Sequence, residues 1–151
     1  MENDMDLITW GEKYATGIEL IDSQHKELVK LTNELYHICR TRNEDLPQVF
    51  KTVMGRMVDY VKLHFTAELG LLKKIKYPQY KDHKEQHVFL IKQILAAANE
   101  YSDGKRFVPQ NFVRTLKDWI FGHIAFYDKQ YAAYIADQKR KGLLTDAQIE
   151  G

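Results

Sequence analysis

The chain has 151 residues, of which 44% are hydrophobic and 28% are charged, and its formal net charge is +1. This length and balance fit one globular domain, and the near-neutral charge excludes a field that would attract nucleic acid or an anionic membrane, so neither partner is expected. Residues 1–7 lack the basic and apolar regions of a secretion signal, and no apolar run has the length of a membrane span. We therefore expect a soluble, cytoplasmic protein.

An N-terminal arm precedes the first predicted helix. Residues 1–21 contain aromatic side chains and glycines, such as Trp10 and Tyr14, without a helical period. We expect this segment to form an ordered arm over the rest of the domain. Asp22 then suits the N-cap of a first helix that runs to about Arg40.

A second helix follows a polar break from Thr41 to Asp45. Pro47 suits the opening turn of this helix, and Tyr77-Pro78 ends it. One face of the helix carries residues at spacings of three and four, which predicts an amphipathic α-helix. These residues are Val53, Met57, Val61, His64, Glu68, Leu72 and Ile75.

The third predicted helix runs from about Lys81 to Tyr101, and Ser102-Asp103-Gly104 predicts a turn at its end. Pro109 begins the fourth helix. The stripe of the fourth helix consists of Phe112, Leu116, Trp119, His123, Tyr127, Tyr131 and Tyr134. The tail, residues 138–151, either frays or forms one short docking helix, and the pattern favours a frayed end.

Four amphipathic segments joined by short polar loops are typical of an antiparallel helical bundle. We predict an all-α fold, a four-helix bundle with up-down-up-down topology and an ordered N-terminal arm. In this prediction residues 1–137 form the bundle domain, with residues 1–21 as its arm, and residues 138–151 form a C-terminal tail.

Histidines stand out on the predicted helix stripes. The chain has six, and five of them lie among core residues: His25, His64, His83, His87 and His123. One histidine on an apolar face is usually a core residue with satisfied hydrogen bonds. Five are different, because each neutral imidazole buried without a partner costs about 1–3 kcal/mol. Converging imidazoles need a common recipient for their nitrogen lone pairs, and a metal ion supplies one.

The spacing of these residues favours chelation. His64 and Glu68 stand at i and i+4, as do His83 and His87. Each pair therefore lies one turn apart on one helix face, with Cβ atoms about 5–6 Å apart. His25 adds a donor from the first helix.

The fourth helix contributes His123 and Asp128, which stand at i and i+5. In a regular α-helix this spacing places two side chains about 140° apart. A local π-bulge, or an aspartate side chain that reaches across the groove, would bring them together.

The sixth histidine, His37, stands twelve residues after His25 and about 120° away from its face in a helix. We assign it to the surface or the bundle edge. It also completes Glu34-Leu35-Tyr36-His37, a Glu-x-x-His pattern that ferritin-like di-iron bundles use twice. Because one copy is present here, we interpret the pattern as accidental.

The donor set consists of five imidazoles and two carboxylates, Glu68 and Asp128. This is too large for one ordinary metal ion but suits two ions that share carboxylates. The set has no thiolate, so it fits iron, manganese or zinc.

Several motifs together resemble bacterial hemerythrins over nearly the whole chain, up to about Asp137. The motifs are Trp10, Tyr14, Thr16-Gly17-Ile18, Ile21-Asp22-x-Gln24-His25, His64-Phe65-x-x-Glu68, Tyr77-Pro78, His83-x-x-x-His87, Trp119-x-x-x-His123-Ile124 and Asp128-x-x-Tyr131. The seven candidate ligands follow the order and spacing of that family.

The resemblance implies two non-haem iron ions, joined by an oxo or hydroxo bridge and by two bridging carboxylates, Glu68 and Asp128. The remaining ligands of one ion would be His83, His87 and His123. The other ion, which keeps an open position for dioxygen, would have the ligands His25 and His64.

The resemblance also implies an apolar pocket at the open position, formed by Leu28, Phe65, Trp119 and Ile124. By pattern alone these four are equally ordinary core residues. One departure from the family is Leu69-Gly70, where bacterial members often carry a second glutamate after the position of Glu68. Leu69 stands one step off the metal face, so we expect ligation to be retained. Gly70 marks either a close approach between helices or sequence drift.

The function implied by the resemblance is reversible dioxygen binding for storage, transport or sensing, without enzymatic activity. The donor set agrees, because neutral imidazoles and few carboxylates leave the reduced centre slightly cationic and favour ferrous iron. The alternatives are a di-iron oxidase or peroxidase, an iron store or sensor, and a metal-free interaction bundle. An enzyme would need a polar substrate pocket, whereas the residues expected around the open position are apolar.

Overall fold

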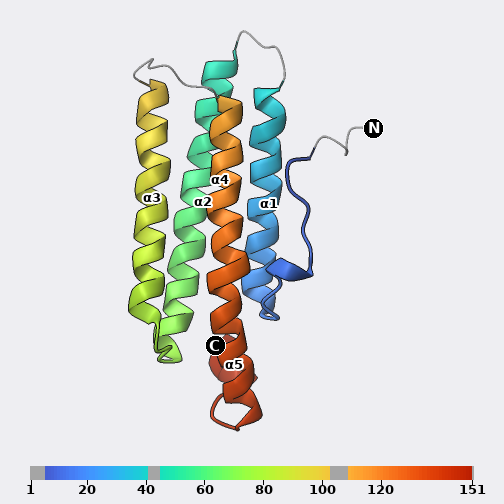
Figure 1. Cartoon of the computed structure of the whole chain (residues 1–151), viewed down its shortest axis with the longest axis vertical. Helices are drawn as coiled ribbons and strands as arrows, with labels where there is room; N and C mark the ends of the chain where they lie inside the picture. The colour runs from blue at the N-terminus through green and yellow to red at the C-terminus, as the bar shows by residue number, and fades with distance from the viewer. Residues whose placement is uncertain (1–5, 41–44, 103–108, 151) are drawn as a thin grey trace.

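The structure, a computed structural model, describes residues 6–40, 45–102 and 109–150 (Figure 1). Its four long helices are α1 (Glu19–Cys39), α2 (Leu46–Lys74), α3 (Tyr80–Ser102) and α4 (Pro109–His123). The shorter elements are a 3-10 turn η2 (Glu12–Tyr14), a π-helical turn η3 (Ile124–Asp128), α5 (Lys129–Arg140) and α6 (Asp146–Glu150).

The four long helices form an antiparallel bundle. Successive helices run in opposite directions, and α4 continues through η3 into α5, which extends beyond the bundle (Figure 1). α2 packs against α1 and α3, and α4 packs against the same two helices. The predicted all-α, up-down-up-down fold is confirmed. Among the described residues, no helix is both long and apolar enough to cross a membrane.

The end of α2 explains the stop predicted at Tyr77-Pro78. Lys76 adopts a left-handed φ of 57° just after the helix. The backbone N–H of Tyr77 then donates to the carbonyl of Leu72 at 2.9 Å, and that of Lys76 donates to Lys73 at 3.1 Å. This pair of bonds is a Schellman motif, which satisfies the last carbonyls of the helix. Pro47 lies in the first turn of α2, as predicted.

The start of α1 differs from the prediction. The helix begins at Glu19, and Asp22 lies inside its first turn instead of capping it. The Asp22 carboxylate instead accepts hydrogen bonds from the backbone N–H and hydroxyl of Thr16, at 2.7 and 2.8 Å, and from the N–H of Gly17 at 3.0 Å. Gly17 has a φ of 81°, so the chain turns sharply there and brings these donors to the carboxylate. Asp22 therefore fixes the arm to the helix.

The described part of the arm before α1, residues 6–18, is ordered, as predicted. Asn33 of α1 accepts the backbone N–H groups of Leu7 and Ile8 at 2.9 and 3.0 Å and donates to the carbonyl of Ile8 at 2.8 Å. Farther along, the Lys129 ammonium donates to the carbonyls of Glu12 and Ala15, at 3.2 and 2.7 Å. These bonds satisfy backbone groups of a segment that has little regular structure of its own.

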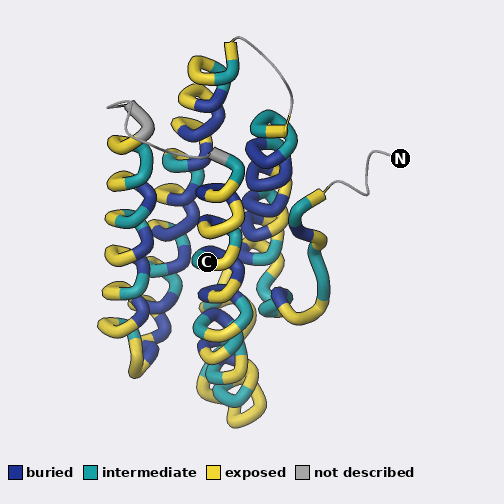
Figure 2. Tube along the Cα trace, turned by 45° about the horizontal axis from the view of Figure 1, so that its top comes forward, coloured by how far each residue is buried: buried dark blue, intermediate teal, exposed yellow. Residues whose placement is uncertain are grey.

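Buried residues lie mainly on the sides of the helices that face the other helices of the bundle (Figure 2). They form two apolar clusters. The first apolar cluster lies among the four long helices and includes Leu28, Phe50, Met57, Phe65, Leu116 and Ile124. The second apolar cluster consists of Ile21, Leu72, Ile75, Tyr77, Tyr131 and Ile135.

The C-terminal tail is folded, so the frayed end favoured by the sequence is wrong for residues 138–150. Gly142 has a φ of 74° and reverses the chain after α5. Leu144 and Ile149 then pack against the second apolar cluster. This apolar contact orders α6, although the helix has only five residues. The predicted turn at residues 102–104 and the polar break at 41–45 fall mostly outside the described residues.

Candidate metal centre

A buried polar layer separates the two apolar clusters. On α1, His25 stands between Ile21 of the second apolar cluster and Leu28 of the first. All seven candidate ligands are 8% exposed or less, and His25, Glu68 and Asp128 are fully buried. Buried charge needs compensation, because an unpaired ion in a protein interior is strongly destabilised. A bound cation is therefore expected in this layer.

The ligand atoms of the first group, Glu68, His83, His87 and His123, lie within 4.8 Å of one another. Glu68 Oε1 is 2.8 Å from Nε2 of both His83 and His87. The ring of Phe65 stacks on His87 with a centroid distance of 3.6 Å and an interplanar angle of 6°, which fixes that imidazole in place.

The second group, His25, His64, Glu68 and Asp128, satisfies the same 4.8 Å limit. His25 Nε2 is 3.0 Å from His64 Nε2 and 3.1 Å from Asp128 Oδ2. Glu68 belongs to both groups. Asp128 also approaches the first group, since its Oδ1 atom is 3.1 Å from His83 Nε2 and 3.2 Å from His123 Nε2. Both carboxylates thus lie between the two sets of imidazoles.

Many polar atoms of the layer are buried without a hydrogen-bond partner. They are Nδ1 of His25, both ring nitrogens of His87, Nε2 of His123 and both carboxylate oxygens of Asp128. His87 Nε2 is close to Glu68, but the geometry is not that of a hydrogen bond. Each such atom costs about 1–3 kcal/mol. Cations would satisfy the atoms that converge at the centre, which are Nε2 of His87 and His123 and the carboxylate oxygens of Asp128. Nitrogen and oxygen donors of this kind fit iron, manganese or zinc.

The protonation of these groups follows from burial and from the two carboxylates. Burial alone lowers the pKa of His25, but Asp128 and Glu68 outweigh it and raise that pKa to about 9. The same opposing effects raise the pKa of His83 to about 9. Burial dominates at His87 and lowers its pKa to about 4. Although burial disfavours their charge, contacts with the histidines lower the pKa values of Glu68 and Asp128.

We expect the metal-free protein to lose stability as the pH rises from about 6.5 to about 9. His25 and His83 have raised pKa values, so their contribution is complete below 6.5 and is lost as the pH passes about 9. Denaturant unfolding across this range would measure the decline. Protein loaded with metal should not show it, because bound metal keeps the imidazoles deprotonated. A flat free energy of unfolding for the metal-free protein would contradict these protonation states.

Of the two arrangements that could bring His123 and Asp128 together, the structure has the π-bulge. Residues Ile124–Asp128 form a π-helical turn directly after His123. A π-turn holds about one residue more than an α-turn, so residues at i and i+5 meet on one face. This local widening accounts for the 3.2 Å approach of Asp128 to His123.

Two residues that contact the candidate ligands received no role from the sequence. The carboxamide oxygen of Gln24 accepts a hydrogen bond from His64 Nδ1 at 2.7 Å. His64 therefore carries its proton on Nδ1, and its Nε2 lone pair faces His25. The Tyr131 hydroxyl donates to Glu68 Oε2 at 2.7 Å and orients that carboxylate. Burial raises the pKa of Tyr131 well above its ordinary value, and the nearby carboxylates add to this, so the hydroxyl remains a donor.

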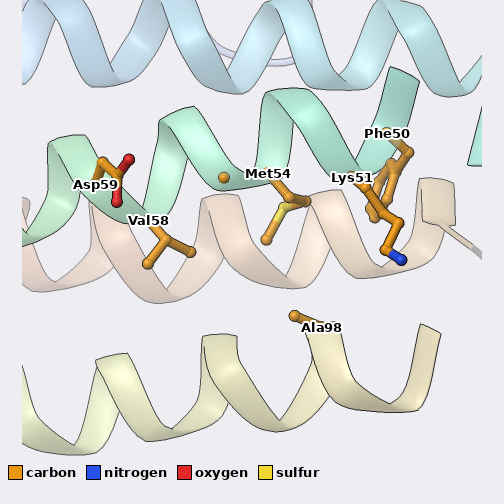
Figure 3. A pocket seen from close by; sticks show the side chains of 7 residues that line it. Phe50, Lys51, Met54, Val58, Asp59 and Ala98 are labelled. Atoms are coloured by element: carbon orange, nitrogen blue, oxygen red, sulfur yellow. The ribbon is translucent and has the colours of Figure 1, made fainter. Parts of the chain in front are cut away.

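Three of the four predicted pocket residues, Leu28, Phe65 and Ile124, are buried in the first apolar cluster. Trp119 is half-buried and packs against that cluster. A cavity of about 280 Å³ opens between α2 and α3 and is lined by residues including Phe50 and Met54 (Figure 3). No candidate ligand lines it, so it is separate from the polar layer.

The structure also tests the roles that the sequence suggested for His37, Glu34 and Gly70. The side chain of His37 is 39% exposed and its Nε2 is 2.6 Å from Asp6, so the assignment to the bundle edge is confirmed. Glu34 forms an ion pair with Arg56 away from the polar layer. A Cβ added to Gly70 would meet no atom within 4 Å, so the close helix approach considered there is wrong.

Comparison with known proteins agrees with this geometry. The family model of the hemerythrin HHE cation binding domain matches residues 16–135. A bacteriohemerythrin of Methylococcus capsulatus is 29% identical over 84% of this chain and 95% of its own. Another, of Stenotrophomonas maltophilia, is 30% identical over 85% of this chain and 81% of its own. A crystal structure of wild-type hemerythrin has a TM-score of 0.77 at 27% identity, covering 84% of this chain and 96% of that one. The chain belongs to the hemerythrin family.

Proposed function

We propose that the chain binds two iron ions and, through them, binds dioxygen reversibly for storage, transport or sensing. The observation that carries this proposal is the convergence of buried, unpaired nitrogen and oxygen atoms in two groups that share Glu68. Family membership supports iron over the other metals that the donor set fits.

In this proposal the first group holds one ion through His83, His87 and His123. The second group holds the other ion through His25 and His64, and Glu68 and Asp128 bridge the two. The distances support the bridging role. Asp128 lies 3.1 Å from His25 and 3.1 Å from His83, one imidazole of each group. Glu68 lies 2.8 Å from His83 and His87 of the first group and 3.5 Å from His64 of the second. With one histidine fewer, the second group leaves room for a small ligand.

Ferrous iron, when bound, supplies the electrons that make dioxygen binding possible and reversible. The chain orients the donors and excludes water. Gln24 aims the Nε2 lone pair of His64 into the centre, and Tyr131 holds the Glu68 carboxylate. Leu28 and Ile124 stand next to the ligands along their helices and are 1% and 2% exposed. These apolar walls keep away proton donors and anions that would otherwise drive irreversible oxidation.

Visible spectroscopy of iron-loaded protein tests the proposal. Anaerobically reduced protein should contain about two irons per chain and should develop a visible band in air that disappears on degassing. A band that persists after degassing would indicate oxidation instead of reversible binding. Metal analysis that gives one iron or none would contradict the dinuclear assignment.

A further inference from the structure

Three tyrosine rings lead from the candidate metal centre toward the surface. Tyr131 is the inner ring: it is fully buried, its hydroxyl is 2.7 Å from Glu68 Oε2, and its centroid is 5.5 Å from that of His83. Tyr77 meets Tyr131 edge to face, with centroids 6.3 Å apart at 78°. Tyr134 meets Tyr77 at 5.3 Å and 65°, and it is only half-buried. Two ring contacts thus connect the buried Tyr131 beside the centre with the partly exposed Tyr134.

Packing alone does not require phenols at these positions. Tyr77 and Tyr131 belong to the second apolar cluster, and Tyr134 packs against it. Phenylalanine would give the same edge-to-face contacts without bringing a hydroxyl into a buried region. Beyond the hydrogen bond from Tyr131 to Glu68, the hydroxyls add redox chemistry, because a phenol can lose one electron together with its proton and regain both.

The surrounding charges favour electron loss from these rings over the aromatic rings of the arm. Trp10 is 6.4 Å from His25 by centroid, but Lys26 Nζ lies 5.6 Å from its ring. A cation over the face of a ring opposes the removal of an electron from it. Tyr131 instead adjoins a carboxylate, and the field of Asp128 reaches Tyr77. These carboxylates offset part of the positive charge that ferric iron brings to the centre, and so they lower the cost of an electron-deficient ring.

We propose that Tyr131, Tyr77 and Tyr134 form a relay for single electrons. When hydrogen peroxide reacts at the metal centre, the relay carries electrons from the surface to the centre, so that the oxidised side chain is finally Tyr134. The relay rests on the proposed function, because it requires iron at the centre. It is separate from dioxygen binding, since phenols are oxidised only by oxidants stronger than those that reversible oxygen binding involves.

The electron balance defines the step. When both irons are already ferric, the two electrons and two protons that convert one hydrogen peroxide into two waters come from phenols. Each phenol loses one electron and one proton and becomes a neutral phenoxyl radical. The radical formed at Tyr131 takes an electron and a proton from Tyr77, and the radical at Tyr77 then takes them from Tyr134. Tyr131 and Tyr77 thereby return to phenols. Because each peroxide takes two electrons, this transfer occurs twice, and two equivalents of an external one-electron reductant such as ascorbate each return one electron and one proton at Tyr134.

The test adds hydrogen peroxide to protein loaded with ferric iron, followed by rapid freezing and electron paramagnetic resonance. Wild type should give a tyrosyl radical that ascorbate removes. Tyr131→Phe should lose that signal. Tyr77→Phe, which leaves the Glu68 contact intact, should form a radical that ascorbate removes far more slowly. Tyr60→Phe is the control, because Tyr60 is half-buried and packs against the first apolar cluster instead. It should behave as wild type.

The outcomes separate the relay from oxygen binding. Iron content is measured for every variant, so loss of metal is not mistaken for loss of the relay. Wild type that holds two irons and binds dioxygen but gives no tyrosyl radical would overturn the relay alone. Equal loss of signal in Tyr60→Phe and Tyr131→Phe would also overturn it. A chain that takes up no iron would overturn the proposed function and the relay together.

Discussion

Replacing Glu68 with alanine should abolish the binding of both iron ions. Glu68 belongs to both groups of candidate ligands, and its Oε1 atom is 2.8 Å from two imidazoles of the first group. The substitution also removes the acceptor of the buried Tyr131 hydroxyl, which costs about 1–3 kcal/mol in the metal-free protein. Metal analysis would measure the loss of iron, and thermal unfolding would show that added iron no longer stabilises the variant.

Glu34→Ala is the matched control for this substitution. Glu34 lies on α1 and forms an ion pair with Arg56, with side chains 37% and 52% exposed. Solvent screens exposed ion pairs, which contribute little to stability, so this variant should keep its iron and most of its stability. Two irons retained in Glu68→Ala would mean that the carboxylate is not a shared ligand. Iron lost from Glu34→Ala would revive the ferritin-like alternative based on Glu34 and His37.

Leu28→Ser should speed the irreversible oxidation of the oxygenated protein many-fold while its iron content stays near wild type. Leu28 stands one turn beyond His25 on α1 and is 1% exposed. Replacing it with a small hydroxylated side chain removes part of the apolar wall and admits water. By analogy with truncation of other buried leucines, it should also cost roughly 2–5 kcal/mol of stability. Stopped-flow spectroscopy would follow the decay of the oxygenated form.

Leu35→Ser separates the oxidation effect from general loss of stability. Leu35 lies on the same helix and is fully buried, but it is ten residues from His25, about 15 Å along the axis. Both substitutions should lower the free energy of unfolding to a similar extent. Only Leu28→Ser should change the decay rate. Equal decay in the two variants would assign Leu28 to core packing and remove its role at the oxygen position.

The sequence was sufficient for the bundle because helix periodicity reports which face is buried. It also indicated an irregularity after His123, because the spacing of His123 and Asp128 conflicts with a regular helix. The choice between a π-turn and an aspartate that reaches across the groove required the structure. The ends of the helices could be predicted less well from the sequence. Asp22 has the residue type of an N-cap, but its partners are decided by the turn at Gly17, which depends on the three-dimensional path of the arm.

Contacts between residues far apart in sequence account for what the sequence did not reveal. The bond from Tyr131 to Glu68 joins residues 63 positions apart, and the bond between His64 and Gln24 joins residues 40 apart. No local pattern encodes either one. The order of the tail likewise depends on Ile149 reaching the second apolar cluster. Residue type therefore identified the candidate ligands, whereas the groups that orient them required the fold.

The π-turn also decides which residues of the helix that follows it face the metal centre. Tyr131 stands eight residues after His123, which in an uninterrupted α-helix would rotate it about 80° away from the imidazole. Because the wide turn absorbs about one residue, Tyr131 occupies the position of a seventh residue, about 20° from His123 on the opposite side. A single-residue change in the length of this turn would thus leave a continuous helix and yet turn Asp128 and Tyr131 away from Glu68 together. The spacing across residues 123–131 is for this reason as much a part of the centre as the residues themselves.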